Sequence, residues 1–218
     1  MFSLAQHLAK AKYLPDLAPD VAYSVQPRLF YGSFNKARPN DMREQSVDLY
    51  LPPFVQKWQV LSLDVERREK ELLRYYTSVL QAARQHRQDL RHLNAYFGLQ
   101  PVLRSKSRTL VSFPWPDTYP RAAGFLRAMQ SDKTTDTLYD EADQGWQFEA
   151  YAVANKLYLA DGSDDDDRPA VVYYTDRDHF AQLAASALTR IQQQLALFVR
   201  ETGQNPWQYG NQELGKPA

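Results

Sequence analysis

The chain has 218 residues, no cysteine and a formal net charge of zero, with 26 basic and 26 acidic residues. Hydrophobic residues make up 44% of it and charged residues 24%, a composition typical of folded globular proteins and not of disordered ones. Without cysteine the chain can have no thiol nucleophile, disulfide, iron–sulfur cluster or cysteine-bound zinc.

The N-terminal part is predicted to contain one short helix and several strands. A capping serine and apolar residues at helical spacing predict a helix over Ser3–Leu14. β-branched and aromatic residues predict a strand over Val21–Tyr31, interrupted at Pro27, and another over Val47–Leu51. For Phe54–Leu61 both helix and strand remain open.

The clearest predicted element is a long helix from about Asp64 to Phe97. Apolar residues recur along it every three or four positions, and Gly98 follows as the expected helix stop. At 1.5 Å per residue this helix would be roughly 50 Å long. Its second half would carry three arginines within about 60° of one another: Arg84, Arg87 and Arg91.

The rest of the chain is predicted to form a strand, a short helix, a three-stranded meander and a second long helix. The strand covers Arg108–Phe113, the short helix covers Tyr119–Gln130, and the polar stretch Ser131–Gly145 is expected to be a loop. The meander consists of Trp146–Val153, Lys156–Ala160 and Ala170–Tyr174. Thr175 and Asp178 have capping-box spacing and would begin a helix over residues 176–202, which Gly203 would end.

These elements predict an α+β fold. An antiparallel sheet would be packed by the two long helices, over about 64–97 and 176–202, and by shorter helices. The sequence has no internal repeat and no recognisable linker. We therefore expect a single domain over residues 1–207 and a polar, frayed tail over residues 208–218.

The sequence lacks the common motifs for phosphate binding, metal binding and nucleophilic catalysis. It has no glycine-rich phosphate loop and no nucleophile elbow, and its four histidines lack metal-binding spacing. The stretch Asp161–Asp167 does not fit a calcium loop, because Asp166 stands where glycine is needed. We therefore predict no cofactor, no metal and no catalytic residue.

Charge is segregated along the chain although it cancels in total. Seven basic residues stand against one acid between Arg74 and Arg108, and thirteen acids stand against four bases between Asp132 and Asp178. Segregation of this size creates surface potentials that steer binding partners. The candidate acidic, partner-binding residues are Asp161, Asp164, Asp165, Asp166 and Asp167. The candidate basic, phosphate-contacting residues are Arg84, Arg87, Arg91, Arg104, Lys106 and Arg108.

The layout of the last third resembles that of the small α+β immunity proteins of bacterial polymorphic toxin systems. This stretch runs from Gly145-Trp146-Gln147-Phe148-Glu149 through the meander and the terminal helix to Asn205-Pro206-Trp207. The resemblance implies a cytoplasmic, non-catalytic protein that binds and blocks a cognate toxin. The Asp-rich loop would then face a basic partner, such as a nuclease. The likeness is one of layout alone, so it carries over no functional residue.

Two other functions stay open. One is nucleic-acid binding through the Arg84–Arg108 surface, and the other is an enzyme whose carboxylates and tyrosines converge only in the fold. A protein partner is our main prediction; self-association through the opposite charges is a further alternative. Because the chain has no apolar run of membrane-spanning length and no secretion-signal pattern, we expect a cytoplasmic protein without a membrane partner.

Overall fold

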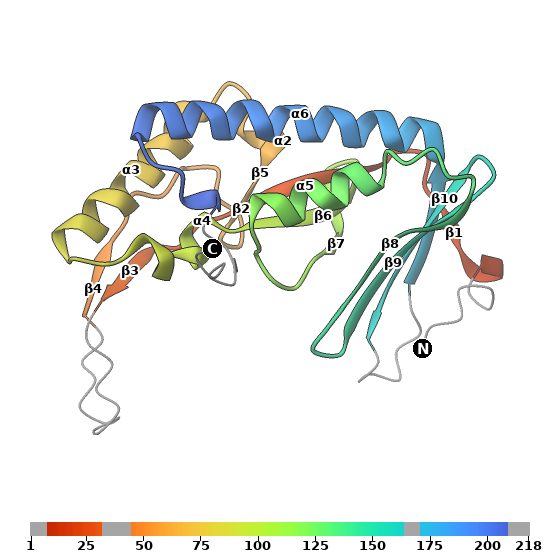
Figure 1. Cartoon of the computed structure of the whole chain (residues 1–218), viewed down its shortest axis with the longest axis horizontal. Helices are drawn as coiled ribbons and strands as arrows, with labels where there is room; N and C mark the ends of the chain where they lie inside the picture. The colour runs from red at the N-terminus through yellow and green to blue at the C-terminus, as the bar shows by residue number, and fades with distance from the viewer. Residues whose placement is uncertain (1–7, 32–44, 164–170, 209–218) are drawn as a thin grey trace, which may run out of the picture. The chain divides into compact units, whose positions relative to one another are not determined.

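A computed structural model describes residues 8–31, 45–163 and 171–208 (Figure 1). It confirms the α+β fold class. Two compact units are present, each assembled from separate stretches of sequence. Unit 1 comprises residues 1–21, 100–115 and 120–191, and unit 2 comprises residues 22–99, 116–119 and 192–218. Four elements have residues in both units: strands β2 (Leu17–Ser24) and β6 (Leu99–Ser105) and helices α5 (Tyr119–Ala128) and α6 (Arg177–Thr202).

Unit 1 is built on a five-stranded sheet with the order β1-β11-β10-β9-β8 (Figure 1). Its strands are β1 (Lys12–Tyr13), β8 (Thr135–Asp143), β9 (Trp146–Val153), β10 (Lys156–Ser163) and β11 (Val171–Asp176). Neighbouring strands are antiparallel except β1, which pairs parallel to β11. The predicted meander is confirmed as β9–β11, and its tight turn lies at Ala154, where φ is 51°.

One face of this sheet, its inner face, forms the core of unit 1. Phe148, Ala150 and Ala152 alternate along β9 and are fully buried, whereas the residues between them are partly exposed. Helix α5 (Tyr119–Ala128) confirms the predicted short helix, and its Phe125 ring meets the Phe148 ring edge to face at 5.9 Å between centroids. Phe113 joins this aromatic cluster, so the core of unit 1 is largely aromatic.

Two segments of unit 1 differ from the sequence prediction. The predicted helix over Ser3–Leu14 is wrong in its described part, where one 3₁₀ turn (η1, Leu8–Lys10) is followed by β1. The Leu14 N–H continues this pairing by donating to the Tyr174 carbonyl at 2.9 Å, and such tertiary pairing outweighs the marginal stability of a short helix. The predicted loop over residues 131–145 is also wrong, because it contains β8.

A hairpin of β6 with β7 (Arg108–Ser112) completes the strands of unit 1. β7 confirms the predicted strand, whereas β6 was not predicted. The turn of this hairpin places Lys106 at a φ of 54°, in the left-handed region that glycine normally occupies.

The continuous helix predicted over residues 64–97 is wrong. Unit 2 instead contains α2 (Ser62–Val65), α3 (Glu69–Gln85), η3 (Leu90–His92) and α4 (Asn94–Phe97). Helix α3 ends in a Schellman motif centred on Arg87, which has a φ of 52°. The Arg87 and Gln88 N–H groups donate to the carbonyls of Arg84 and Ala83, at 3.2 and 2.8 Å. Because glycine usually holds this left-handed position, an arginine there gives no sequence signal for the end of the helix.

Gly98 does not act as the expected helix stop either. Its φ of −66° is available to any residue. A Cβ at this position would lie 2.4 Å from the Cβ of Pro116, so glycine is required by close backbone approach.

Three short strands accompany the helices of unit 2. β3 (Arg28–Tyr31) pairs antiparallel with β4 (Gln45–Asp48), and β5 (Gln59–Leu61) pairs with the last residues of β2. The predicted strand over residues 21–31 is therefore two strands, separated around Pro27. The ambiguous stretch Phe54–Leu61 contains β5 and no helix.

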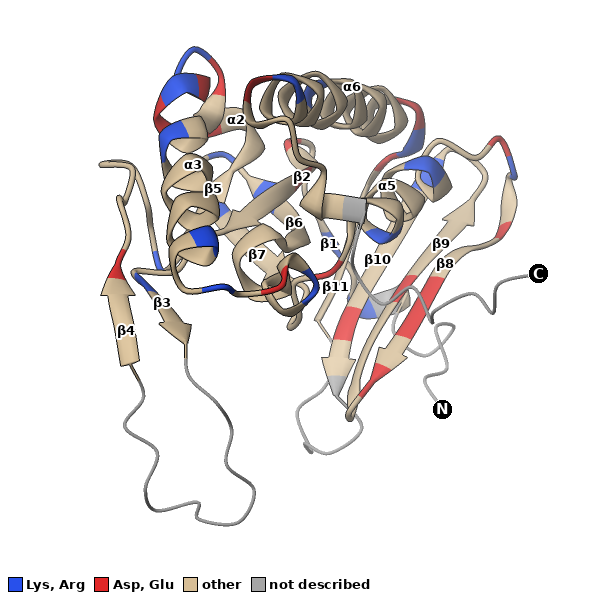
Figure 2. Ribbon diagram, turned by 60° about the vertical axis from the view of Figure 1, so that its left-hand side comes forward, with Lys and Arg blue, Asp and Glu red and all other residues tan. Residues whose placement is uncertain are grey.

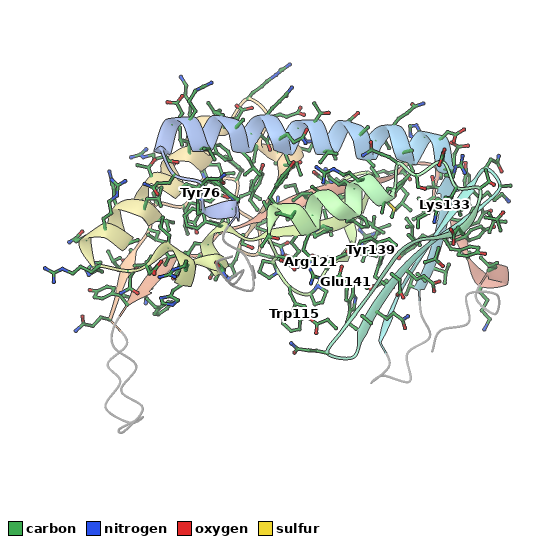
Figure 3. All side chains as sticks on the ribbon, in the orientation of Figure 1. Tyr76, Trp115, Arg121, Lys133, Tyr139 and Glu141 are labelled. Carbon is green, nitrogen blue, oxygen red and sulfur yellow. The ribbon has the colours of Figure 1, made fainter. Side chains whose placement is uncertain are left out.

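An aromatic cluster forms the core of unit 2. Trp207, in the 3₁₀ turn η4 (Pro206–Gln208), lies edge to face with Tyr76 and Phe97, at 4.9 and 5.4 Å between ring centroids. Phe198 packs on the same indole ring at 5.9 Å. Burial raises the pKa of Tyr76 (labelled in Figure 3) well above its ordinary value, so this hydroxyl stays neutral in the folded protein.

Helix α6 confirms the second long helix, with one change at its start. The Asp176 carboxylate accepts the His179 N–H at 2.8 Å, so Asp176 is the capping residue and Thr175 is a buried strand residue. Gly203, with a φ of 65°, follows the helix as predicted. No helix in the described ranges is long and apolar enough to cross a membrane. Residues 209–218, most of the predicted tail, lie outside those ranges.

Candidate functional site

Of the predicted acidic loop, only Asp161 lies in the described part of the chain; Asp164–Asp167 fall outside it. Asp161 is opposite Phe148 in the pairing of β10 with β9, so it belongs to the inner face. Its carboxylate accepts a hydrogen bond from the Trp146 indole N–H at 2.8 Å. Burial raises the pKa of Asp161, and this hydrogen bond opposes the rise. Asp161 is therefore part of the sheet's packed side and not of an exposed loop tip.

The six predicted basic residues are divided between the two units. Unit 2 holds Arg84, Arg87 and Arg91, and unit 1 holds Arg104, Lys106 and Arg108. Because helix α3 ends at Gln85, the first three do not share one helix face. The Arg91 guanidinium is paired with Asp89, Nε to Oδ2 at 2.9 Å, and lowers the pKa of Asp89 to about 2. Lys106 and Arg108 are exposed in the β6–β7 hairpin. Nucleic-acid binding by this set stays a prediction.

Arg104 belongs to a buried ion triad in unit 1. The Asp20 side chain on β2 is only 2% exposed, and its two carboxylate oxygens face two guanidinium groups. Arg104 Nη1 lies 3.3 Å from Oδ2 and Arg190 Nη2 lies 3.2 Å from Oδ1. The triad links β2, β6 and α6, and Arg104 therefore has a structural partner for its charge.

A row of tyrosines crosses the outer face of the five-stranded sheet, which is opposite the aromatic core. We call these residues the tyrosine face: Tyr13 on β1, Tyr174 on β11, Tyr158 on β10 and Tyr151 on β9. Each is directly opposite the next in the strand pairing, and directly opposed residues share one face of a sheet. Ring centroids are 5.1 Å apart for Tyr13–Tyr174 and 5.4 Å for Tyr158–Tyr174. Tyr13 is 52% exposed and the other three are half-buried, so the row is open to a partner.

Charged side chains flank the tyrosine face. The Lys156 ammonium lies 5.1 Å from the centre of the Tyr174 ring, which shows that this row accepts a cation on an aromatic face. On the other side of the row along the strands, Glu149, two residues before Tyr151, is directly opposite Asp140 on β8. Like charges in such a pair repel each other. Acidic residues mark the strands of this sheet in Figure 2.

The Asp140–Glu149 pair should make the stability of the protein depend on pH. Burial raises the pKa of Glu149 above 4.5, and the charge of Asp140 raises it further, against a hydrogen bond with Thr137. A carboxyl group with a raised folded pKa contributes stability below its ordinary value, and this contribution is lost as pH rises through the folded value. In urea titrations between pH 4 and 7, Glu149→Gln should therefore lose less stability with rising pH than the wild type. Equal slopes for Glu149→Gln and wild type would contradict the prediction.

Among the described residues, burial raises the pKa of two carboxyl groups, Glu149 and Asp161, and these two do not form a catalytic pair. Glu149 belongs to the outer face, whereas Asp161 belongs to the inner face. Among the described residues there is also no group of three or more histidines and acids that could hold a metal ion.

No protein-family model, no curated protein and no solved structure matches this chain. The tyrosine face and its flanking charges are therefore the strongest basis for a functional proposal.

Proposed function

We propose that the protein is a non-catalytic binding module that docks a protein partner with exposed cationic side chains on the tyrosine face. The observation that carries this proposal is the row of four accessible tyrosines across four adjacent strands. Tyrosine is enriched at the energetic centres of protein interfaces, because its ring buries a large apolar area and its hydroxyl forms hydrogen bonds. Rings held by a sheet lose little conformational entropy on binding.

The charges around the row favour a basic partner. Arginine and lysine side chains stack on tyrosine rings and pair with carboxylates. Tyrosine rings and carboxylates lie next to each other on this face of the sheet. A cation between Asp140 and Glu149 would also relieve the repulsion within that pair. The excess of thirteen acids over four bases between Asp132 and Asp178 would steer such a partner towards this part of the chain.

Nucleic acid is the alternative partner. Tyrosine rings also stack on exposed bases. A nucleic-acid backbone would, however, bring phosphates to the end of the row that holds Asp140 and Glu149, where like charges oppose binding.

The specific form of the proposal is a cytoplasmic bacterial immunity protein that neutralises a toxin by direct binding. Its support is the C-terminal layout described above and the acidity of the same sheet, which suits a basic toxin domain. The Asp164–Asp167 stretch joins β10 to β11 in the sequence and adds four carboxylates to this region of the chain.

Titration with a nonaarginine peptide tests the docking surface. The double variant Tyr151→Ala/Tyr158→Ala should bind the peptide at least about tenfold more weakly in isothermal titration calorimetry, because interface anchors contribute 2 kcal/mol or more. The control Phe30→Ala removes an exposed aromatic residue of unit 2 and should bind as wild type does. Circular dichroism spectra should match for all three proteins.

Three outcomes would overturn this proposal. The first is an unchanged affinity in the double variant. The second is tighter binding of an oligothymidine than of the peptide, lost in the double variant, which would identify a nucleic-acid surface. The third is self-association in sedimentation velocity that the double variant abolishes, which would identify a second copy as the occupant.

A further inference from the structure

An open groove lies beside β8, the edge strand of the five-stranded sheet. It is lined by Pro120, Arg121 and Gly124 of helix α5 and by Tyr139, Asp140 and Glu141 of β8. In Figure 3 the labelled Arg121, Tyr139 and Glu141 lie together between these two elements. All six residues belong to unit 1.

In the groove, one oxygen of the Glu141 carboxylate accepts a hydrogen bond and the other has only a more distant ion-pair partner. The Tyr139 hydroxyl donates to Oε2 of Glu141, while Arg121 Nη1 lies 3.6 Å from Oε1. A close charge-assisted bond would measure about 2.7–2.9 Å. The Arg121 side chain is 61% exposed and that of Glu141 only 22%, so the carboxylate is the more enclosed partner.

Gly124 leaves empty space in the helical wall of the groove. A Cβ built at this position would have no atom within 4 Å beyond its chain neighbours and its own helix. Glycine is among the least favourable residues inside a helix, and alanine would fit this position without a clash. Gly124 therefore keeps a volume open that a larger residue would fill.

We propose that this groove receives an arginine side chain of the partner and acts as a specificity pocket. The inference rests on the proposed function. A guanidinium entering the groove would pair with Oε1 of Glu141 and lie along the Tyr139 ring, a combination that its planar, multi-donor shape suits. An acidic side chain would be repelled by the Glu141 carboxylate, and an apolar one would remove water from that carboxylate without replacing its hydrogen bonds.

The position of the groove lets one partner segment reach both surfaces. Successive side chains of a strand point to opposite faces. Accordingly Asp140 is opposite Glu149 on the outer face, while Glu141 is opposite Phe148 on the inner face. A segment that crosses the edge of β8 can therefore contact the acidic end of the tyrosine face and place one side chain in the groove.

Filling the groove tests this inference. Gly124→Leu should weaken nonaarginine binding about tenfold, whereas Gly124→Ala, which adds only one methyl group, should change it less than threefold. Glu141→Gln should reduce the preference for nonaarginine over nonalysine, because the neutral amide no longer pairs with the guanidinium. Thermal unfolding of each variant shows that the fold is retained, and Gly124→Ala should melt no lower than wild type.

The outcomes separate this inference from the proposed function. If the Tyr151→Ala/Tyr158→Ala protein loses binding while Gly124→Leu and Glu141→Gln bind as wild type, the groove is not the pocket and the docking surface stands. If none of these variants changes affinity, both proposals fall. Loss of binding in Gly124→Leu with retention in Gly124→Ala, together with a reduced arginine preference in Glu141→Gln, supports the pocket.

Discussion

Replacing Asp20 with alanine should lower the free energy of unfolding by about 3–5 kcal/mol, the cost of removing one partner from a buried ion pair. Asp20 is 1% exposed, and its carboxylate lies 3.3 Å from Arg104 and 3.2 Å from Arg190. Those guanidinium side chains are only 13% and 17% exposed, so they would stay largely buried after the Asp20 charge is removed. Urea denaturation followed by circular dichroism measures the loss.

Two further variants separate charge from other effects at this position. Asp20→Asn keeps the shape of the side chain but removes the charge, and should lose most of the same stability. Asp16→Ala removes a carboxylate that accepts only the Ser105 hydroxyl, at 2.9 Å, among its described contacts; it should cost about 1 kcal/mol. If Asp20→Ala cost no more than Asp16→Ala, the triad would not be a buried charge network.

Replacing Trp207 with alanine should cost about 3–5 kcal/mol, as expected for truncating a buried aromatic side chain. Trp207 is 2% exposed and packs on Tyr76, Phe97 and Phe198, so its removal leaves a cavity in the core of unit 2. Chemical denaturation of the purified variant, followed by circular dichroism, measures the change.

Trp58→Ala is the matched control, because it removes the same side chain at a 52% exposed position of the same unit. It should change stability by no more than about 0.5 kcal/mol. If Trp207→Ala lost as little stability as Trp58→Ala, the indole at position 207 would not be part of the core.

Elements with a complete local signal were predictable from the sequence. Helix α6 has an apolar stripe, a cap region and Gly203 at its end, and strand β9 alternates Phe148, Ala150 and Ala152 with polar or larger residues. β8 was missed because it is an edge strand, and edge strands carry charges that make them look like loops. Helix α3 ends with Arg87 in the left-handed conformation, and helix propensity alone does not predict a helix end at an arginine.

The candidate site was less accessible to sequence reasoning than the fold. None of the four tyrosines was predicted as a site residue, although the alternation of Tyr151 and Tyr158 with apolar residues was a signal that could have placed these two on one face of the predicted meander. Tyr13 could not be placed in this way, since its segment was predicted to be helical, and its partner Tyr174 is joined to it by a long-range parallel pairing. The Asp140–Glu149 pair could be predicted only if β8 was recognised as a strand. Long-range strand register, not residue type, therefore determined what was missed.

The discontinuous make-up of the two units constrains when each can form during synthesis. Lys12 emerges from the ribosome long before Tyr173, the residue it pairs with. At translation rates of about 5–20 residues per second, the residues of β1 are made roughly 8–30 s before those of β11. Unit 1 needs the chain through residue 191, and unit 2 needs the segment that contains Trp207. Unit 1 can therefore form only after residue 191 has been made, and unit 2 only after Trp207, and neither unit corresponds to one uninterrupted stretch of the sequence.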